Sequence, residues 1–231
     1  MLFLRKLHKW LGLVIGLQVV LWAASGLMFA WLDPAAVDAA GSVRSVEPAV
    51  LSSTMVKTEP ATWLGDYPAQ DLYDVRAMLL AGRWVWRIEL QDRVELRSVE
   101  EGARVNVDEP WLRRLALERY AGSGRLIAAT LQTQPDIASR ASGPVWQAQF
   151  DDPQRTALYF AADDGHFIVA RTASWRLYDF FWMLHTMDYV GRDNFNNPLI
   201  VTIGMATLWL SISGVLLLIR SFRRQVTRIA A

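Results

Sequence analysis

The amino-acid sequence predicts an α+β protein in which two transmembrane helices flank an exported domain of antiparallel strands with a packed helix. Three observations lead to this prediction. An uncharged apolar run of 22 residues lies near each end of the 231-residue chain. Basic residues lie on the outer side of both runs, and apolar and polar residues alternate in the part between them. Alternation with a period of two is typical of half-buried strands, and an uncharged run of about 20 residues is long enough to cross a bilayer.

The first predicted transmembrane helix spans residues 11–32. Its uncharged residues would extend over about 33 Å at 1.5 Å per residue, which matches the thickness of a bilayer core. The alternative is a cleaved signal peptide, but the apolar part of a signal peptide has only about 7 to 15 residues. We therefore expect the helix to be retained, with residues 1–10 as a short segment outside the membrane.

The second predicted transmembrane helix spans residues 198–219. Asn196 or Asn197 is expected as its N-cap, and Pro198 suits the first helical position because no hydrogen bond is lost there. Arginines follow this helix in the tail of residues 220–231, and basic residues also precede the first helix. The positive-inside rule then predicts a two-pass membrane protein with both termini cytoplasmic and the central domain outside, which in a bacterial cell means the periplasm.

The part between the two helices is expected to begin with a tether, residues 33–61, which includes a short helix at Pro48–Met55. A domain follows the tether. Short alternating runs separated by turns predict meandering strands, and the same order of features occurs twice. We therefore expect two repeats in residues 62–172, one over about 62–107 and the other over about 108–172.

The two predicted repeats share particular residues. Trp86 in the first repeat corresponds to Trp146 in the second, and Gly102 corresponds to Gly165, each glycine after acidic turn residues. The predicted strands cover residues 84–90, 93–99, 103–107, 126–132, 143–150, 156–161 and 166–171.

Each repeat is also expected to pack a helix on its sheet. In the second repeat, Asp108 caps this helix and Gly122 follows its end. In the first repeat, the helix is expected over residues 69–80.

Three segments resemble a known family, the PepSY-associated transmembrane proteins. The opening of these proteins is similar to the run LRKLHKWLGLVIGL. Their later helix resembles DFFWMLHTMDYVGRDNFNNPLI followed by SISGVLLLIRSFRR, and the double meander is similar to the PepSY fold. The resemblance covers essentially the whole chain, and it implies an inner-membrane protein with a periplasmic PepSY-type domain.

Some larger relatives have four spanning helices and are implicated in ferric-siderophore reduction through membrane haem ligated by histidines. This chain departs from them, because it has two predicted spans and no flavin or nicotinamide motif.

Two of the three histidines match the histidines of the family's motifs, so the resemblance makes them candidate haem ligands. His8 lies in the N-terminal motif and His185 in the aromatic segment. Neutral imidazoles are common axial ligands of a b-type haem, and an apolar aromatic setting suits the macrocycle. Phe181, Trp182 and Tyr189 would supply that setting, because helical spacing places them on the face of His185.

The aromatic segment, residues 173–197, is expected to form an interfacial helix and a turn. Whether this helix lies flat on the membrane or continues the second span stays open. The alternative to haem is that His185 is an ordinary residue of an interfacial aromatic belt and that His8 faces lipid headgroups. One chain cannot clamp one haem with both histidines, because the predicted topology separates them by about a bilayer thickness. A homodimer or another membrane protein would have to complete each site.

The composition argues against several other classes of protein. Cysteine is absent, which excludes disulfides, iron–sulfur clusters and a cysteine nucleophile. The net charge of +1 gives no indication of nucleic-acid binding. No hydrolase or phosphate-binding motif is present, so we predict no catalytic residues. His166 is expected to be an ordinary residue at a strand start.

Four acidic pairs lie at turns or at a helix start, where a structural role is expected. Weak binding of a divalent cation is the alternative, and we predict no metal site. The pairs are Glu100–Glu101, Asp108–Glu109, Asp151–Asp152 and Asp163–Asp164.

The sequence thus favours a membrane-anchored accessory protein whose periplasmic domain binds or modulates a partner membrane or periplasmic protein. The alternative is a haem-binding electron-transfer component of a ferric-siderophore or metal reductase system. A further alternative, by analogy of fold, is inhibition of a periplasmic protease. The expected partners are the lipid bilayer and another membrane protein or a second copy of the chain.

Overall fold

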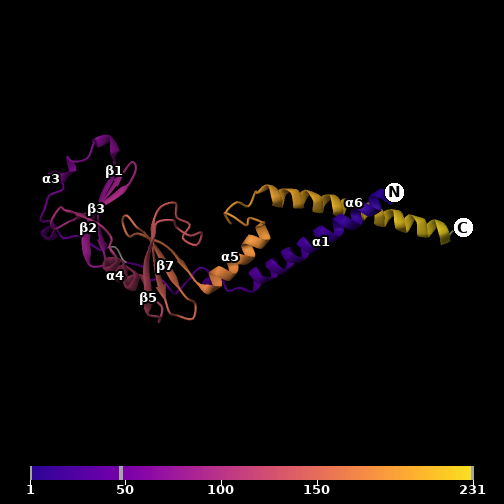
Figure 1. The fold of residues 1–231 in the computed structure, drawn as a ribbon, viewed down its shortest axis with the longest axis horizontal. Helices are drawn as coiled ribbons and strands as arrows, with labels where there is room; N and C mark the ends of the chain where they lie inside the picture. The colour runs from indigo at the N-terminus through magenta and orange to yellow at the C-terminus, as the bar shows by residue number, and fades with distance from the viewer. Residues whose placement is uncertain (1, 47–48, 230–231) are drawn as a thin grey trace. The chain divides into compact units, whose positions relative to one another are not determined.

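The computed structural model of the chain describes residues 2–46 and 49–229 (Figure 1). The chain divides into two compact units. Asp33–Arg176 form a unit that contains all the strands, and the residues before and after this range form a helical unit.

The helical unit contains both predicted membrane spans. Helix α1 (Leu2–Trp31) and helix α6 (Pro198–Ile229) each include an apolar stretch long enough to cross a membrane. Only 11% of the most apolar part of the first helix and 6% of the second is buried within the protein, so most of their apolar surface is free to contact lipid. The prediction of an α+β fold with a span at each end is confirmed. Both helices are longer than predicted, because the basic residues outside each apolar run continue the helix.

The start of α1 and the end of α6 lie at the same end of the helical unit (Figure 1). A hydrogen bond between His8 and Ser213 joins the two helices there. The predicted two-pass topology requires such an antiparallel pair. The side chains of the predicted tail arginines Arg223, Arg224 and Arg228 lie outside the described part of the chain.

The second span begins at the predicted residue, and Asn197 is its cap. The Asn197 side-chain oxygen accepts hydrogen bonds from the backbone N–H groups of Leu199 and Ile200, at 3.1 and 3.0 Å. Helix α5 (Ala173–Thr186) ends well before this cap, and a loop over residues 187–197 separates the two helices. The aromatic helix therefore does not continue the second span.

Two four-stranded antiparallel sheets form the core of the other unit, and the strands of each follow one another in chain order. The first sheet consists of β1 (Leu72–Leu80), β2 (Arg83–Leu90), β3 (Val94–Ser98) and β4 (Arg104–Val105). The second consists of β5 (Leu126–Gln132), β6 (Val145–Phe150), β7 (Ala157–Ala161) and β8 (Phe167–Arg171).

The two sheets share several structural details. Gly102 and Gly165 both have a positive φ, 69° and 68°, which glycine adopts without a steric cost. The N–H of Gly102 donates to Ser98 O at 2.9 Å, and the N–H of Gly165 donates to Ala161 O at 3.0 Å. The matched glycines thus close the same turn in each repeat. The first strand of each sheet also has an irregularity in register near its start.

The prediction of a helix over residues 69–80 is wrong. Only Ala69–Asp71 form a short 3-10 turn, and the remainder is strand β1, which pairs with β2 along its length. A single-turn helix, α3 (Ala61–Leu64), precedes this strand instead. In the second repeat, Asp108 caps helix α4 (Glu109–Arg119) as predicted, through a 2.8 Å hydrogen bond from the Trp111 N–H.

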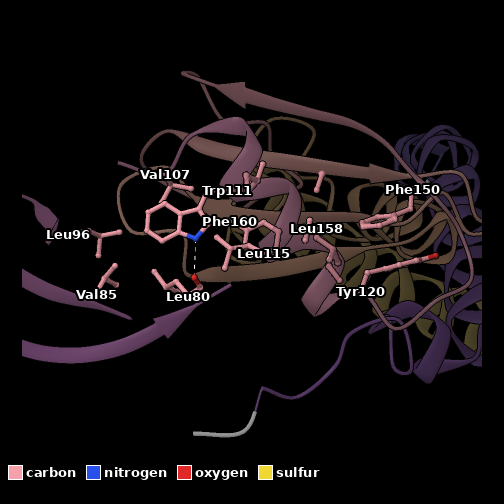
Figure 2. Close-up of a cluster of buried hydrophobic side chains, with 14 of the residues drawn as sticks. Leu80, Val85, Leu96, Val107, Trp111, Leu115, Tyr120, Phe150, Leu158 and Phe160 are labelled. Carbon is pink, nitrogen blue, oxygen red and sulfur yellow. Dashed lines mark hydrogen bonds between the residues drawn. The ribbon is translucent and has the colours of Figure 1, made fainter. Parts of the chain in front are cut away.

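Helix α4 is at the centre of the largest buried cluster (Figure 2). Trp111 and Leu112 are almost completely buried, and the Trp111 indole N–H donates to Leu80 O at 3.0 Å. Figure 2 shows side chains of the first sheet at one end of the helix and of the second sheet beside it. At the far end, the ring of Tyr120 stacks on Phe150 with centroids 3.7 Å apart. The apolar face of one helix thus joins the two sheets, and each fully buried large side chain contributes about 1.5–3 kcal/mol.

The first residues of the predicted tether pack on this domain. Ala39 is buried in the same cluster as Trp111. Val43 forms a β-bridge with Tyr120, and the N–H of Arg44 donates to Arg119 O at 2.7 Å. Of the short helix expected at Pro48–Met55, the described residues contain only a 3-10 turn at Ser53–Met55, and Pro48 lies outside them.

Candidate histidine sites in the helical unit

The contacts of α1 with α5 and α6 recur along one seam of the helix. Seven residues make about two helical turns, so residues seven apart lie on one face. On α1, a seven-residue spacing relates His8, Ile15, Trp22 and Phe29. Ser25 and Gln18 lie between members of this series, at the spacing of three or four residues that keeps them on the seam.

His8 lies on the seam near the start of α1 and faces α6. Its Nδ1 is 2.8 Å from the hydroxyl oxygen of Ser213, which is 5% exposed. The Ser213 hydroxyl in turn donates to Leu210 O at 2.9 Å within α6. Gly214 lies beside the imidazole, and a Cβ atom there would be 3.3 Å from His8 Cε1. The imidazole thus packs against a position that has no side chain.

His185, in the last turn of α5, makes an equivalent contact with α1. Its Nδ1 is 2.8 Å from the hydroxyl oxygen of Ser25, which is completely buried. The Ser25 hydroxyl lies 2.8 Å from Leu21 O and 3.0 Å from Trp22 O, within its own helix. The Trp22 indole N–H donates to the backbone oxygen of His185 at 2.8 Å and fixes the end of α5.

The aromatic setting of His185 differs from the prediction. Phe29 of α1 contacts the imidazole edge-on, with centroids 5.5 Å apart, and Trp182 packs on Phe29 at 6.1 Å. Phe181 instead contacts Phe180 at 5.5 Å.

Tyr189 is half exposed and lies beyond the end of the helix. Its helical spacing from His185 has no structural meaning, because α5 stops at Thr186. Of the three predicted aromatic residues, only Trp182 thus joins the cluster around His185.

The two histidines belong to separate sites. His8 and Ser25 are 17 residues apart on one helix, a rise of about 25 Å. His185 is hydrogen-bonded to Ser25, so it lies at that far level. Two imidazole nitrogens bound to one metal ion, each at about 2 Å, would be only about 4 Å apart. The structure therefore agrees with the expectation that one chain cannot bring both histidines to one haem.

The loop between α5 and α6 is held by side-chain contacts. Arg192 forms an ion pair with the buried carboxylate of Asp179, and Phe195 packs against Trp182 at 6.4 Å. The amide of Asn197 donates to Thr186 O at 2.8 Å, which ties the cap of α6 to the end of α5. The end of α5, and with it His185, is thereby fixed against α1 and α6.

A second group of titratable residues lies in the domain, at the turn before β8. The buried carboxylate of Asp164 accepts hydrogen bonds from Arg87 Nε and His166 Nδ1, both at 2.7 Å. Burial alone would raise the pKa of Asp164, but these hydrogen bonds hold it well below its usual range. The hydrogen bond to Asp164 raises the pKa of His166.

Asp163, Asp164 and His166 lie close enough together to hold a metal ion. Arg87 is the counter-ion of Asp164, however, and the positive charge of its guanidinium opposes a cation at this point. The group connects β2 of the first sheet to a turn of the second, so we interpret it as structural. His166 was expected to be an ordinary residue at a strand start, but its imidazole takes part in this hydrogen-bonded group.

Sequence reasoning identified the histidines but not their partners. Ser25, Ser213 and Phe29 lie on other helices, and no local motif marks them. The seven-residue spacing along α1 is the one signal that relates Phe29 to His8.

Comparison with known proteins identifies the family of the chain. The family model described as the PepSY-associated TM region matches residues 2–223. No curated protein and no solved structure matches the chain significantly.

Proposed function

Because the chain belongs to the PepSY-associated transmembrane family, we propose that it is a membrane-anchored accessory protein whose central domain binds an extended segment of a partner protein. Two membrane helices hold the domain at the bilayer. With both termini cytoplasmic, as the basic residues at the two ends favour, the domain is presented to the periplasm.

The observation that supports this function is a groove beside strand β1. The strand is at the edge of its sheet, so its outer side has no neighbouring strand in the described part of the domain. The groove has a volume of about 420 Å³, and its lining includes Ala77–Ala81, Leu115 and Phe160. An extended peptide that adds to a sheet edge gains backbone hydrogen bonds, and an adjacent apolar groove accepts its side chains.

Site-specific photo-crosslinking in intact membranes tests this proposal. A photoreactive residue at Leu79, in the groove, should yield a defined adduct with a partner protein, and one at the exposed Thr130 of β5 should not. Filling the groove with Ala77→Trp should abolish the adduct while the protein still accumulates. Equal adducts at both positions, or an adduct that survives Ala77→Trp, would contradict binding at this edge.

A second candidate function is electron transfer through b-type haem, and the two histidines support it. His8 and His185 each have Nδ1 engaged by a serine of the facing helix, which leaves Nε2 to coordinate a metal. Histidine ligands are commonly held through the second ring nitrogen in this way. Each site supplies one ligand, so the second ligand would come from another copy of the chain or from a partner. A bound haem would supply one-electron chemistry.

The absorption spectrum of the detergent-purified protein tests this candidate. A Soret band that is diminished by His185→Ala and by His8→Ala supports haem ligation. A colourless preparation from haem-replete cells would remove this function and leave the accessory role untouched.

A further inference from the structure

We propose that Ser25 and Ser213 are positioning residues that hold His185 and His8 in the tautomer with the proton on Nδ1. The geometry thereby assigns Nε2 as the coordinating atom at both sites. The tautomer follows from hydrogen bonding alone. Its use in ligation rests on the second function proposed above.

The argument begins with the protons available to each serine. A hydroxyl group has one proton to donate and two lone pairs that accept. The Ser25 oxygen is 2.8 Å from Leu21 O and 3.0 Å from Trp22 O, so its proton lies between two carbonyl oxygens. The contact with His185 Nδ1 at 2.8 Å must then be one in which the imidazole N–H donates and Ser25 accepts.

The opposite arrangement is unfavourable at this position. If Ser25 donated to His185, its lone pairs would face two carbonyl oxygens at hydrogen-bonding distance, with no proton between them. His185 would then carry its proton on Nε2, for which the described residues supply no acceptor. Because Ser25 is completely buried, no water lies between its oxygen and the two carbonyl oxygens to relieve this contact.

Ser213 repeats this arrangement on the other helix. Its hydroxyl donates to Leu210 O at 2.9 Å, and its oxygen is 2.8 Å from His8 Nδ1. Gly214 then leaves space along the free edge of the imidazole, since a Cβ atom there would lie 3.3 Å from Cε1 and 3.8 Å from Nε2. Two histidines on different helices thus have the same hydrogen-bonded geometry.

Nitrogen NMR of the haem-free, full-length protein in detergent measures the tautomer directly. Histidine labelled with ¹⁵N gives distinct shifts for protonated and unprotonated ring nitrogens. The chain has only three histidines, so His8→Gln, His166→Gln and His185→Gln assign every signal. We expect the proton on Nδ1 in both His8 and His185. A proton on Nε2 in either would overturn the assignment for that site.

Serine variants test whether the serines cause this preference. Ser25→Ala removes the acceptor of His185 and should transfer its proton to Nε2, with His8 unchanged. Ser213→Ala should do the reverse. Ser25→Thr keeps the hydroxyl and should restore the Nδ1–H form. The matched control is Ser211→Ala, because Ser211 makes the same intrahelical bond, to Thr207 O at 2.9 Å, but is exposed.

The readouts separate the inference from the haem function. Retention of the Nδ1–H form in Ser25→Ala, with helix content unchanged by circular dichroism, would contradict a positioning role. If the wild-type protein binds haem, Ser25→Ala should weaken the affinity by about 10–100-fold, as loss of an outer hydrogen bond does at metal sites. If it binds none, the haem function fails while the tautomer result stands.

Discussion

Asp164 shows how strongly one residue can join the two repeats. Its carboxylate is 1% exposed and the Arg87 side chain is 11% exposed, so their 2.7 Å ion pair is shielded from water. The pair Lys57–Glu100 has the same length, but its side chains are 66% and 63% exposed. The two ion pairs therefore form a natural comparison of a buried and an exposed charge pair.

We expect Asp164→Asn to lower the free energy of unfolding of the domain by about 3 kcal/mol, because removal of one partner leaves a buried charge incompletely compensated. Lys57→Ala should cost far less than Asp164→Asn, as is usual for exposed pairs. Urea unfolding of the full chain in detergent, followed by tryptophan fluorescence, measures both. Equal losses in the two variants would show that the Asp164 pair is not shielded.

His166 should make the stability of the domain depend on pH. The hydrogen bond to Asp164 raises the pKa of His166 in the folded protein, so the folded state binds this proton more tightly than the unfolded state. The contribution is complete below the ordinary histidine pKa of about 6.5 and is lost as the pH rises through the raised pKa. Urea unfolding should therefore show stability falling over this range in the wild type. A slope that persists in His166→Gln would assign it to another group.

At the level of the elements, the success of the sequence analysis depended on whether the signal was local. The two spans are uncharged runs, and the later strands alternate, so their own residues identify them. The helical spacing of Leu72, Val75 and Leu79 favours a helix where the structure has strand β1. Its extended form depends on pairing with β2, which a local pattern does not show.

For the candidate sites too, the sequence predicts the residues within local motifs but not their partners on other helices. His8 and His185 were identifiable within their motifs. The hydrogen bonds of the histidines with Ser25 and Ser213 form only when α1 packs against α5 and α6, so they depend on contacts between residues 160 and 205 positions apart. Tyr189 failed as a prediction because the helical period was extended beyond the end of α5.

The seam of α1 also contains a polar side chain without a hydrogen bond. Gln18 Nε2 is buried and has no hydrogen-bond partner within the described chain. An unsatisfied buried donor costs about 1–3 kcal/mol, so Gln18→Leu should stabilise the helical unit by an amount of that order. Unfolding in sodium dodecyl sulfate, against Leu17→Ile as a control at an exposed position, measures the change. Destabilisation by Gln18→Leu would mean that the amide has a partner in the membrane.

At the scale of the whole molecule, the protein has two parts that need different surroundings. The apolar surfaces of α1 and α6 are largely uncovered, whereas the domain has its own buried core around α4. The proposed orientation and the proposed groove together imply that the domain is accessible from the periplasm and that a partner covers strand β1.

One labelling experiment tests this central claim, because the chain contains no cysteine and single cysteines can be introduced cleanly. Spheroplasts carrying Thr130→Cys, Ala77→Cys or Ser221→Cys are treated with a maleimide that does not cross membranes. We predict rapid labelling at Thr130, slower labelling at Ala77 than in the purified protein, and labelling at Ser221 only after lysis. Labelling of Ser221 but not Thr130 in intact spheroplasts, or equal rates at Ala77 in both preparations, would contradict the account.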